Sequence, residues 1–438
     1  MILLRKIVII AMLLCLAFIA RKLHEPMGHG APLAESAFSL GFLLLFAFLF
    51  GRIAILLKAP MITGFLVAGA VAGPFGLGII TSEGAEPLRL MDNLALALIA
   101  FSAGGELNIN KYKEQMKGLM WTLGAQTVFV FVLVFSLFSF LFISVDLFNG
   151  STGISIAAAM LLGIVATANS PATAIAVITE TRSKGPVSDN IIGVTVVKDV
   201  MVIILFGLAI SLTEALMGGD GGVSFSFAGH IIYELAVSAV VGVVIGFAMI
   251  TYLEGGDDNV ALFLVGMGLI VVEICLYLEI RPLLASIMAG FVVENVSAKG
   301  EKLMLGLRTS SLPIFVIFFS LAGQGLDMNA LIDMWPLALA LVATRMVGVR
   351  FGSIYGAAKV YDNVSIGRFA WTGFVGQAGV SLGFALMIGD QFPGWGAKLA
   401  TLIVAGVVIN QLVGPIMMKR SLTLAGEVEV ESDEREKS

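Results

Sequence analysis

The stretch LLGIVATANSPATAIAVITE, residues 161–180, is mostly apolar and carries a short polar run at its centre that holds Thr167, Asn169 and Ser170. Pro171 follows that run. Proline has no N–H and its ring clashes with the carbonyl four residues earlier, so the carbonyl of Thr167 loses its helical partner. The stretch therefore predicts a membrane helix that is interrupted near its middle. A kinked helix repaired by its own hydroxyl groups is the simpler alternative.

A second apolar stretch, RFAWTGFVGQAGVSLGFALMI at residues 368–388, is interrupted in a different way. It is rich in glycine, including Gly376, and it carries Gln377 at mid-depth. Close packing between helices through small residues would account for the glycines alone. The place of this stretch in the chain, compared with that of the first, favours a second broken helix.

Composition places the chain in a lipid bilayer. Of its 438 residues, 58% are hydrophobic and only 13% are charged, whereas soluble domains carry roughly 25% charged residues. A spanning helix needs about 20 mostly apolar residues, and windows of that length predict fourteen spans joined by short loops. They lie at 4–20, 34–57, 60–80, 88–104, 116–144, 153–181, 187–213, 228–252, 259–279, 282–297, 308–326, 331–357, 366–388 and 397–418.

The two broken helices occupy matching places in the order of spans. When the first span is set aside, thirteen remain, and the broken helices are the fifth and the twelfth. Spans one to six and eight to thirteen then form inverted six-helix repeats, at about 34–213 and 228–419, with the seventh as a link helix at about 228–252, and each repeat has its broken helix in fifth place. Paired broken helices in inverted halves point to a transport site near the bilayer midplane.

Basic residues in the short loops gather on one side, which predicts that both chain termini are cytoplasmic. Residues 1–33 are expected to form an extra N-terminal helix and an outside loop, although the basic start and short apolar run also fit a signal peptide. Residues 421–438 are expected to form an acidic cytoplasmic tail, which is disordered from Ala425 onward. A bacterial inner (plasma) membrane is the expected location.

Ionisable and amide side chains interrupt the apolar spans at a few positions. Lys198 and Asp199 stand side by side in GVTVVKDVMVIILFGL, residues 193–208, and Arg345 lies near the middle of its span. A charge at the centre of a membrane helix costs about 2.5–3.5 kcal/mol on insertion scales, which makes such residues functional candidates. Asn410 is a weaker candidate of the same kind.

Several motifs, in the right order along about residues 34–420, resemble the monovalent cation:proton antiporter superfamily, the sodium/proton exchangers and their relatives. Each motif is weak alone, and the ordered set is specific. The stretches that are similar to the second, third, ninth, tenth and twelfth helices of that family are APMITGFLVAGAVAGPFGLGII, ALIAFSAGGELNINKYK, YLEIRPLLASIMAGFVVEN, LPIFVIFFSLAGQGLDM and WTGFVGQAGVSLGFALMI.

The resemblance implies a core domain that moves against a dimerising domain, and hence a homodimer. It implies that the unwound fifth and twelfth helices cross beside a sixth-helix aspartate, whose position Asp199 matches, and that Arg345 matches a basic residue of the eleventh helix. The crossing carries over to Thr167, Asn169, Ser170 and Pro171 and to Gly376 and Gln377. Two departures remove negative charge: Lys198 stands where the family has Asp, Asn or Gln, and Ser170 stands where an acid is frequent.

These residues suit the binding of a hard cation, which prefers oxygen ligands. Asp199 would bind Na⁺ or K⁺ with help from neutral oxygens of Thr167, Asn169 and Ser170, or would take a proton instead. One carboxylate that holds either ion predicts electroneutral exchange by alternating access. We expect the partners to be a monovalent cation, protons and lipid, with no nucleic acid and no cofactor.

Alternatives remain open at this point. Lys198 could clamp the crossing, carry a coupled proton, or mark a different substrate. Glu106, Glu273 or a helix carbonyl could be its partner, and Glu273 could instead serve helix packing. The chain could instead be a K⁺-efflux, channel-like system that needs a regulatory subunit, or a non-transporting scaffold or sensor. An enzyme is not expected, because the sequence shows no Ser/His/Asp set, no His-rich metal cluster and no phosphate-binding glycine loop beside a strand.

Overall fold

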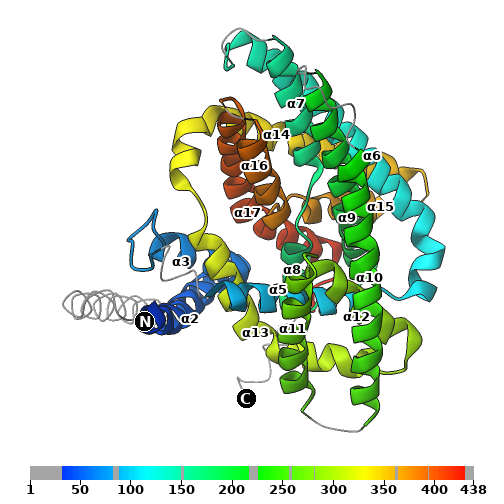
Figure 1. Ribbon diagram of the computed structural model, residues 1–438. Coiled ribbons are helices and arrows are strands. Elements are labelled where there is room, and N and C mark those ends of the chain that lie inside the picture. The colour runs from blue at the N-terminus through cyan, green and yellow to red at the C-terminus, as the bar shows by residue number, and fades with distance from the viewer. Residues whose placement is uncertain are drawn as a thin grey trace.

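The computed structural model describes residues 32–81, 88–148, 152–216, 225–255, 259–280, 282–360, 364–392 and 394–429. These segments form an all-helical protein, as expected (Figure 1). The expected first span at 4–20 and the end of the acidic tail lie outside the described residues.

The helices follow the expected spans in order, and both interrupted stretches are broken. The fifth span consists of α7 and α8, and the twelfth consists of α15, the 3₁₀ helix η3 and α16. The helices are α2 (Pro32–Leu56), α3 (Met61–Ala72), α5 (Arg89–Glu106), α6 (Ile109–Ser144), α7 (Thr152–Thr167), α8 (Pro171–Thr181), α9 (Pro186–Leu216), α10 (Phe225–Glu254), α11 (Val260–Tyr277), α12 (Pro282–Val296), α13 (Gly300–Gln324), α14 (Met328–Ala358), α15 (Val364–Phe369), η3 (Ala370–Phe374), α16 (Gly379–Gln391) and α17 (Gly396–Ala425).

Seven of the described helices are long and apolar enough to cross a membrane on their own, and bent helix pairs raise the number to nine at most. Three further apolar helices, α3, α7 and α12, are shorter than the roughly 20 residues that a full span requires. Thirteen complete crossings and the inverted repeat therefore remain predictions.

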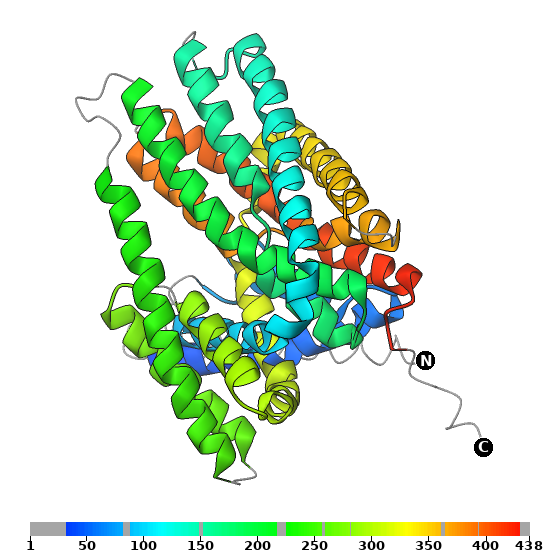
Figure 2. The ribbon, with the colours of Figure 1, turned by 90° about the vertical axis from the view of Figure 1, so that its right-hand side faces the viewer.

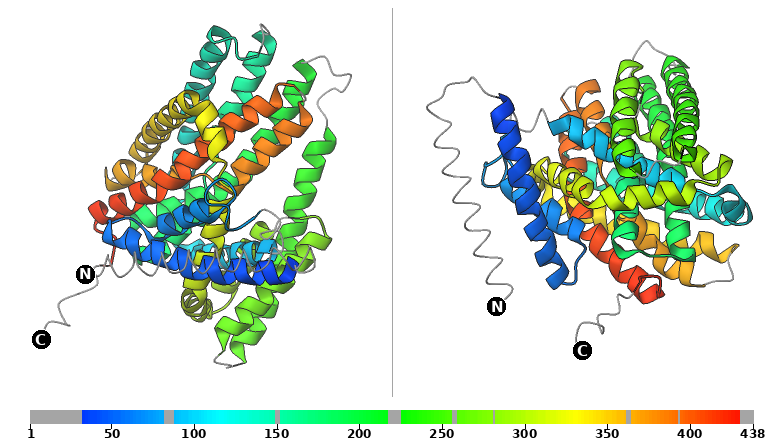
Figure 3. Two further views of the ribbon diagram at one scale, coloured as in Figure 1. Left: turned by 90° about the vertical axis from the view of Figure 1, so that its left-hand side faces the viewer. Right: turned by 90° about the horizontal axis from the view of Figure 1, so that it is seen from below.

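Two bundles divide the structure. The core bundle contains α6 to α9 and α14 to α17; the second bundle contains α2, α3, α5 and α10 to α13. In Figure 1 the core bundle occupies the upper part of the view and most of the second bundle the lower part. Figures 2 and 3 show the same division from two sides and from below.

A glycine ridge holds α14 against α6 in the core bundle. Gly352 and Gly356 follow one another at four-residue spacing, and a Cβ atom on either would lie 2.5 Å from the Cα of Gln126 or Thr122 on α6. Small residues at this spacing let two membrane helices approach at backbone distance. The close approach places Gln126 deep in the core bundle, where it is fully buried.

At the end of the molecule predicted to be cytoplasmic, the core bundle contacts the second bundle through Glu180. Its carboxylate accepts a hydrogen bond from the backbone N–H of Met61 at 2.7 Å, at the start of α3. Lys419 of α17 lies 3.9 Å from the same carboxylate and donates to the carbonyl of Ala59. A carboxylate suits this place because the first N–H groups of a helix lack helical partners.

The C-terminal segment takes part in the fold for longer than the sequence indicated. Helix α17 continues to Ala425, and Glu427 accepts hydrogen bonds from the backbone N–H groups of Val187 and Ser188 at 2.7 and 2.8 Å. Glu427 thereby caps α9, the helix that carries Asp199. Composition predicted a disordered tail from Ala425, because it does not register a capping contact with a distant helix.

Candidate functional site

Two unwound segments meet in the middle of the core bundle. The first separates α7 from α8, and the second separates η3 from α16. The backbone N–H of Ser170 donates to the carbonyl of Gly376 at 2.9 Å, which joins the two segments. Gly414 of α17 lies against them so closely that a Cβ atom there would come within 2.9 Å of the Gly376 backbone. The two breaks, which the sequence predicted and which lie about 200 residues apart along the chain, are thus in contact in the structure.

Arg345 binds both breaks at once. Its guanidinium donates to the carbonyls of Ala166 and Ala168 at 2.7 Å, at the end of α7, and to those of Phe374 and Val375 at 2.8 and 2.7 Å, at the end of η3. The last carbonyls of a helix lack helical partners and carry partial negative charge. One fully buried arginine therefore neutralises two helix ends that point toward each other.

Gln377 adds a second connection across the crossing. Its Nε2 donates to the carbonyl of Val165 on α7 at 3.1 Å, and its Oε1 accepts from Nδ2 of Asn410 on α17 at 2.8 Å. Both side chains are buried. The structure therefore places Asn410 behind Gln377, where it positions the amide of Gln377.

The ammonium of Lys198 donates to Oε1 of Gln126 at 2.8 Å, and Nε2 of Gln126 donates to the hydroxyl of Ser353 at the same distance. The ammonium also lies 5.6 Å from the centre of the Phe374 ring, within range of a cation–π interaction. Sequence reasoning missed Gln126. A lone glutamine in an otherwise apolar span was the available signal.

The two carboxylates expected as partners of Lys198 lie elsewhere. Glu106 lines a cleft of about 800 Å³ at the end predicted to be cytoplasmic, together with Arg182 and Lys299. Glu273 is exposed on α11 of the second bundle. Both residues belong to the second bundle, and neither takes part in the crossing.

Asp199 lies on α9 and is only 4% exposed. Helix α9 packs against α7, α8 and η3, the elements that flank the two breaks. The hydroxyl of Thr167 donates to the carbonyl of Ile164 at 2.7 Å, which leaves its lone pairs able to accept a cation. Arg345 binds the carbonyls on either side of Thr167, as described above.

Ser170 has a different role from the one expected. Its hydroxyl oxygen accepts from both the backbone N–H and the hydroxyl of Thr173, at 3.2 and 3.0 Å, and so forms the N-cap of α8. A hydroxyl oxygen has two lone pairs, and these two bonds occupy them. Ser170 therefore stabilises the break, and its side chain is poorly suited to bind a cation.

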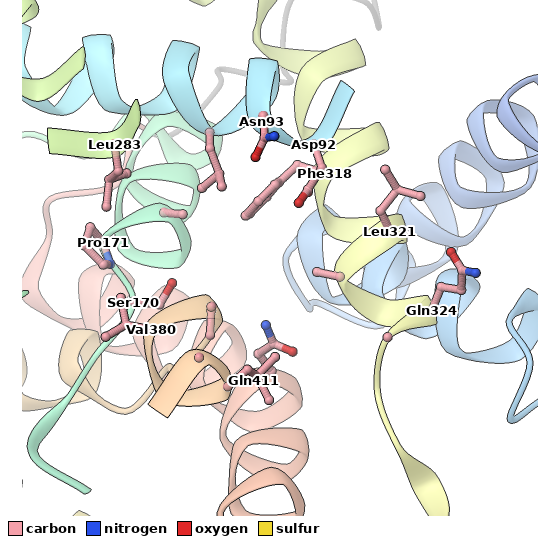
Figure 4. A pocket seen from close by; sticks show the side chains of 18 of the residues that line it. Asp92, Asn93, Ser170, Pro171, Leu283, Phe318, Leu321, Gln324, Val380 and Gln411 are labelled. Carbon is pink, nitrogen blue, oxygen red and sulfur yellow. The ribbon is translucent and has the colours of Figure 1, made fainter. Parts of the chain in front are cut away.

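A cavity of about 690 Å³ lies between the two bundles and reaches the crossing (Figure 4). Asp92 and Asn93 of α5 lie on the second-bundle side, while Asn169 and Gln411 belong to the core bundle. The cavity extends to the ends of α3 and α13 that are predicted to face outside, where Gln324 lies. Asp199 is not among the residues that line this cavity.

Asn169 and Gln411 are the two amide side chains of the core bundle that line this cavity, next to Ser170. They are 3% and 2% exposed. Within the described part of the chain, neither amide atom of Asn169 has a hydrogen-bond partner, and Oε1 of Gln411 has none. Buried polar atoms without partners are rare in folded proteins and need an explanation. The expected residue Asn169 thus lies at the cavity, and Gln411 stands next to the weaker candidate Asn410 but was not among the predicted site residues.

Comparison with known proteins gives one family. The family model described as sodium/hydrogen exchanger, transmembrane, matches residues 41–423. A relative from Methanocaldococcus jannaschii named "Probable Na(+)/H(+) antiporter 3" is 24% identical over 82% of this chain and 90% of its own length. The "Ammonium/H(+) antiporter subunit AmhT" of Alkalihalophilus pseudofirmus is 22% identical over 74% of this chain and 80% of its own length.

Solved structures agree on the fold. The sodium proton antiporter MjNhaP1 from Methanocaldococcus jannaschii superimposes with a TM-score of 0.69 and 18% identity, over 91% of this chain and 100% of that chain. A second structure of the same antiporter, at pH 8, gives a TM-score of 0.66.

Proposed function

The chain belongs to the sodium/hydrogen exchanger family, and from this premise we propose that it exchanges a monovalent cation for protons through Asp199 by alternating access. The protein is a secondary transporter of the membrane and not an enzyme. The observation that carries the proposal is a buried aspartate on a helix packed against the crossing of two broken helices.

The chemistry follows from one carboxylate in an apolar bundle. A buried charge without compensation costs several kcal/mol, so the carboxylate of Asp199 holds either a cation or a proton while the core bundle moves. The carbonyl and hydroxyl of Thr167 supply neutral oxygens from the neighbouring break. Because the two ions compete for one acid, we propose that one proton moves for each cation and that the cycle is electroneutral.

Lys198 and Arg345 have structural roles in this scheme. Arg345 holds the helix ends together, and Lys198 joins α9 to α6 through Gln126. Of the three alternatives that the sequence left open for Lys198, the hydrogen bond to a neutral amide supports the clamp. The proposal keeps Na⁺ and K⁺ as the candidate cations and a homodimer as the working unit.

Flux measurements test the proposed exchange. Purified protein is reconstituted into liposomes that contain a pH-sensitive dye, and Li⁺, Na⁺, K⁺ or ammonium is then added outside. We expect cation-driven proton movement with at least one of them, at a rate that a membrane potential of either sign leaves unchanged. A folded, correctly inserted protein that moves protons with none of these cations would contradict the proposal. Dependence of the rate on potential would contradict electroneutrality alone.

The clamp between Lys198 and Gln126 makes a separate prediction. Gln126→Leu leaves a buried ammonium without its acceptor, and we expect the free energy of unfolding to fall by about 1–3 kcal/mol. Lys198→Met in the same chain removes the ammonium as well, so the double variant should be more stable than Gln126→Leu alone. Thermal unfolding in detergent measures the four proteins of this cycle. Additive losses would show that Lys198 does not depend on Gln126.

A further inference from the structure

The floor of the outer cavity presents oxygen atoms that no protein group satisfies. The amide of Asn169, in the first break, and Oε1 of Gln411, on α17, are buried and lack hydrogen-bond partners among the described residues. Figure 4 shows Gln411 extending from its helix into the cavity, on the same side as Ser170 and Pro171. Leaving a buried amide unsatisfied costs about 1–3 kcal/mol. A ligand that enters the cavity would offset this cost.

The two amides lie at the outer cavity, so a cation that enters from that side contacts them before Asp199. The cavity is lined by Asn169 and Gln411 at the crossing, while Asp199 does not line it. A cation that enters from the side predicted to be outside passes Asp92 on the second-bundle side, and at the crossing it reaches the two carboxamides before it reaches the carboxylate of Asp199. Asn169 and Gln411 both belong to the core bundle, so they move together with the crossing.

We propose that Asn169 and Gln411 form an outer cation site of neutral oxygens, which a cation occupies on its way to Asp199 and which favours weakly hydrated cations. This inference rests on the exchange proposed above. Carboxamide oxygens are ligands for alkali cations, and they carry no net charge. Neutral ligands recover little of the dehydration cost of the small ions Li⁺ and Na⁺. K⁺ and ammonium shed water more readily, and they are the substrates that such a site accepts.

The positive charge of Arg345 near the two amides also favours weakly hydrated cations. Lys198 and Arg345 are buried in the same bundle, and Arg345 binds the carbonyl of Ala168, the residue before Asn169. The guanidinium of Arg345 lowers the attraction that the two amides exert on any cation, whereas the carboxylate of Asp92 belongs to the second-bundle side of the cavity and not to the crossing. Weak attraction favours ions that need the least compensation for lost water.

The experiment uses variants of Gln411 in membrane vesicles of both orientations, from a host without exchangers of its own. Right-side-out and inverted vesicles report the apparent KM for cations on the outer and inner faces separately. In the wild type we expect the outer KM to be lower for K⁺ and ammonium than for Na⁺ and Li⁺. Gln411→Leu should raise the outer KM for K⁺ by about tenfold, the equivalent of one lost ion–oxygen contact, and leave the inner KM unchanged.

Gln411→Glu supplies the complementary result. A carboxylate in place of the amide strengthens the attraction at the site, so the outer preference should shift toward Na⁺ and Li⁺. Thr401→Val is the matched control, because it removes a polar group from α17 whose hydroxyl bonds only within its own helix. This control should leave both KM values unchanged.

The possible failures are distinguishable. A wild-type protein that moves protons with no cation would overturn the exchange and the outer site together. An active wild type whose outer KM is the same in Gln411→Leu, or rises equally on both faces, would overturn the outer site alone. A wild type that favours Na⁺ and Li⁺ from outside, or a Gln411→Glu variant with unchanged preference, would overturn the selectivity.

Discussion

Replacing Asp199 with Asn is expected to abolish cation-driven proton movement, down to the rate of liposomes without protein. The amide keeps the shape of the side chain and its capacity for hydrogen bonds. It cannot release a proton when a cation arrives, and it cannot balance the cation's charge inside the bundle. Both halves of the exchange fail together, so the loss should be the same for every cation tested.

Two further variants separate loss of chemistry from loss of structure. Asp189→Asn is the same substitution near the start of the same helix, at the cleft predicted to be cytoplasmic, and it should leave the flux nearly unchanged. Asp199→Glu retains the acid at a shifted position and should retain measurable exchange. Full activity in Asp199→Asn would show that another group couples the two ions, and it would overturn the role proposed for Asp199.

Much of the fold could be predicted because the bilayer restricts the choices. Only helices satisfy their backbone groups in lipid without help, so apolar windows gave the helices and their order. Pro171 marked the first break through its missing N–H. Gly376 and Gln377 marked the second because neither residue suits the middle of a simple apolar helix. These are local signals, and the structure places the two breaks in contact.

The partners of the buried charges could not be predicted in the same way. Lys198 meets Gln126, 72 positions away, and the sequence suggested Glu106 or Glu273 because acids are the usual partners of a lysine. Lys198 bonds to Gln126 because the glycine ridge of α14 lets α6 pack closely, and this close packing buries the amide of Gln126 in the core bundle. Glu427 similarly caps α9 across 240 residues. Contacts of this kind depend on packing between helices, and no local pattern encodes them.

The largest structural effect is expected at Arg345. Arg345→Met removes the five N–H donors of a guanidinium and leaves four carbonyls, at the ends of α7 and η3, without a partner. Each buried and unsatisfied polar group costs about 1–3 kcal/mol. Part of this loss of stability is offset, because the substitution also removes a buried charge, which is itself costly. We expect the free energy of unfolding to fall by about 4 kcal/mol or more, a size of effect that few single substitutions reach.

Arg345→Lys tests the geometry of the same contact. An ammonium is a compact charge with three donors and cannot reproduce the planar arrangement that reaches both helix ends. This variant should be intermediate in stability, and its exchange should be slower than that of the wild type. Arg350→Met is the control, since Arg350 is exposed on the same helix and lies over the ring of Trp371; its loss should cost about 1 kcal/mol or less.

Thermal unfolding and flux on the same preparations decide between two roles for Arg345. If the arginine acts by holding the crossing, stability and exchange fall together, with Arg345→Lys between the wild type and Arg345→Met in both. If Arg345→Met unfolds at the same temperature as the wild type but no longer transports, the arginine acts on the substrate instead. The four carbonyl contacts would then add little to stability, and the crossing would have to be held by Gln377 and the Ser170–Gly376 hydrogen bond.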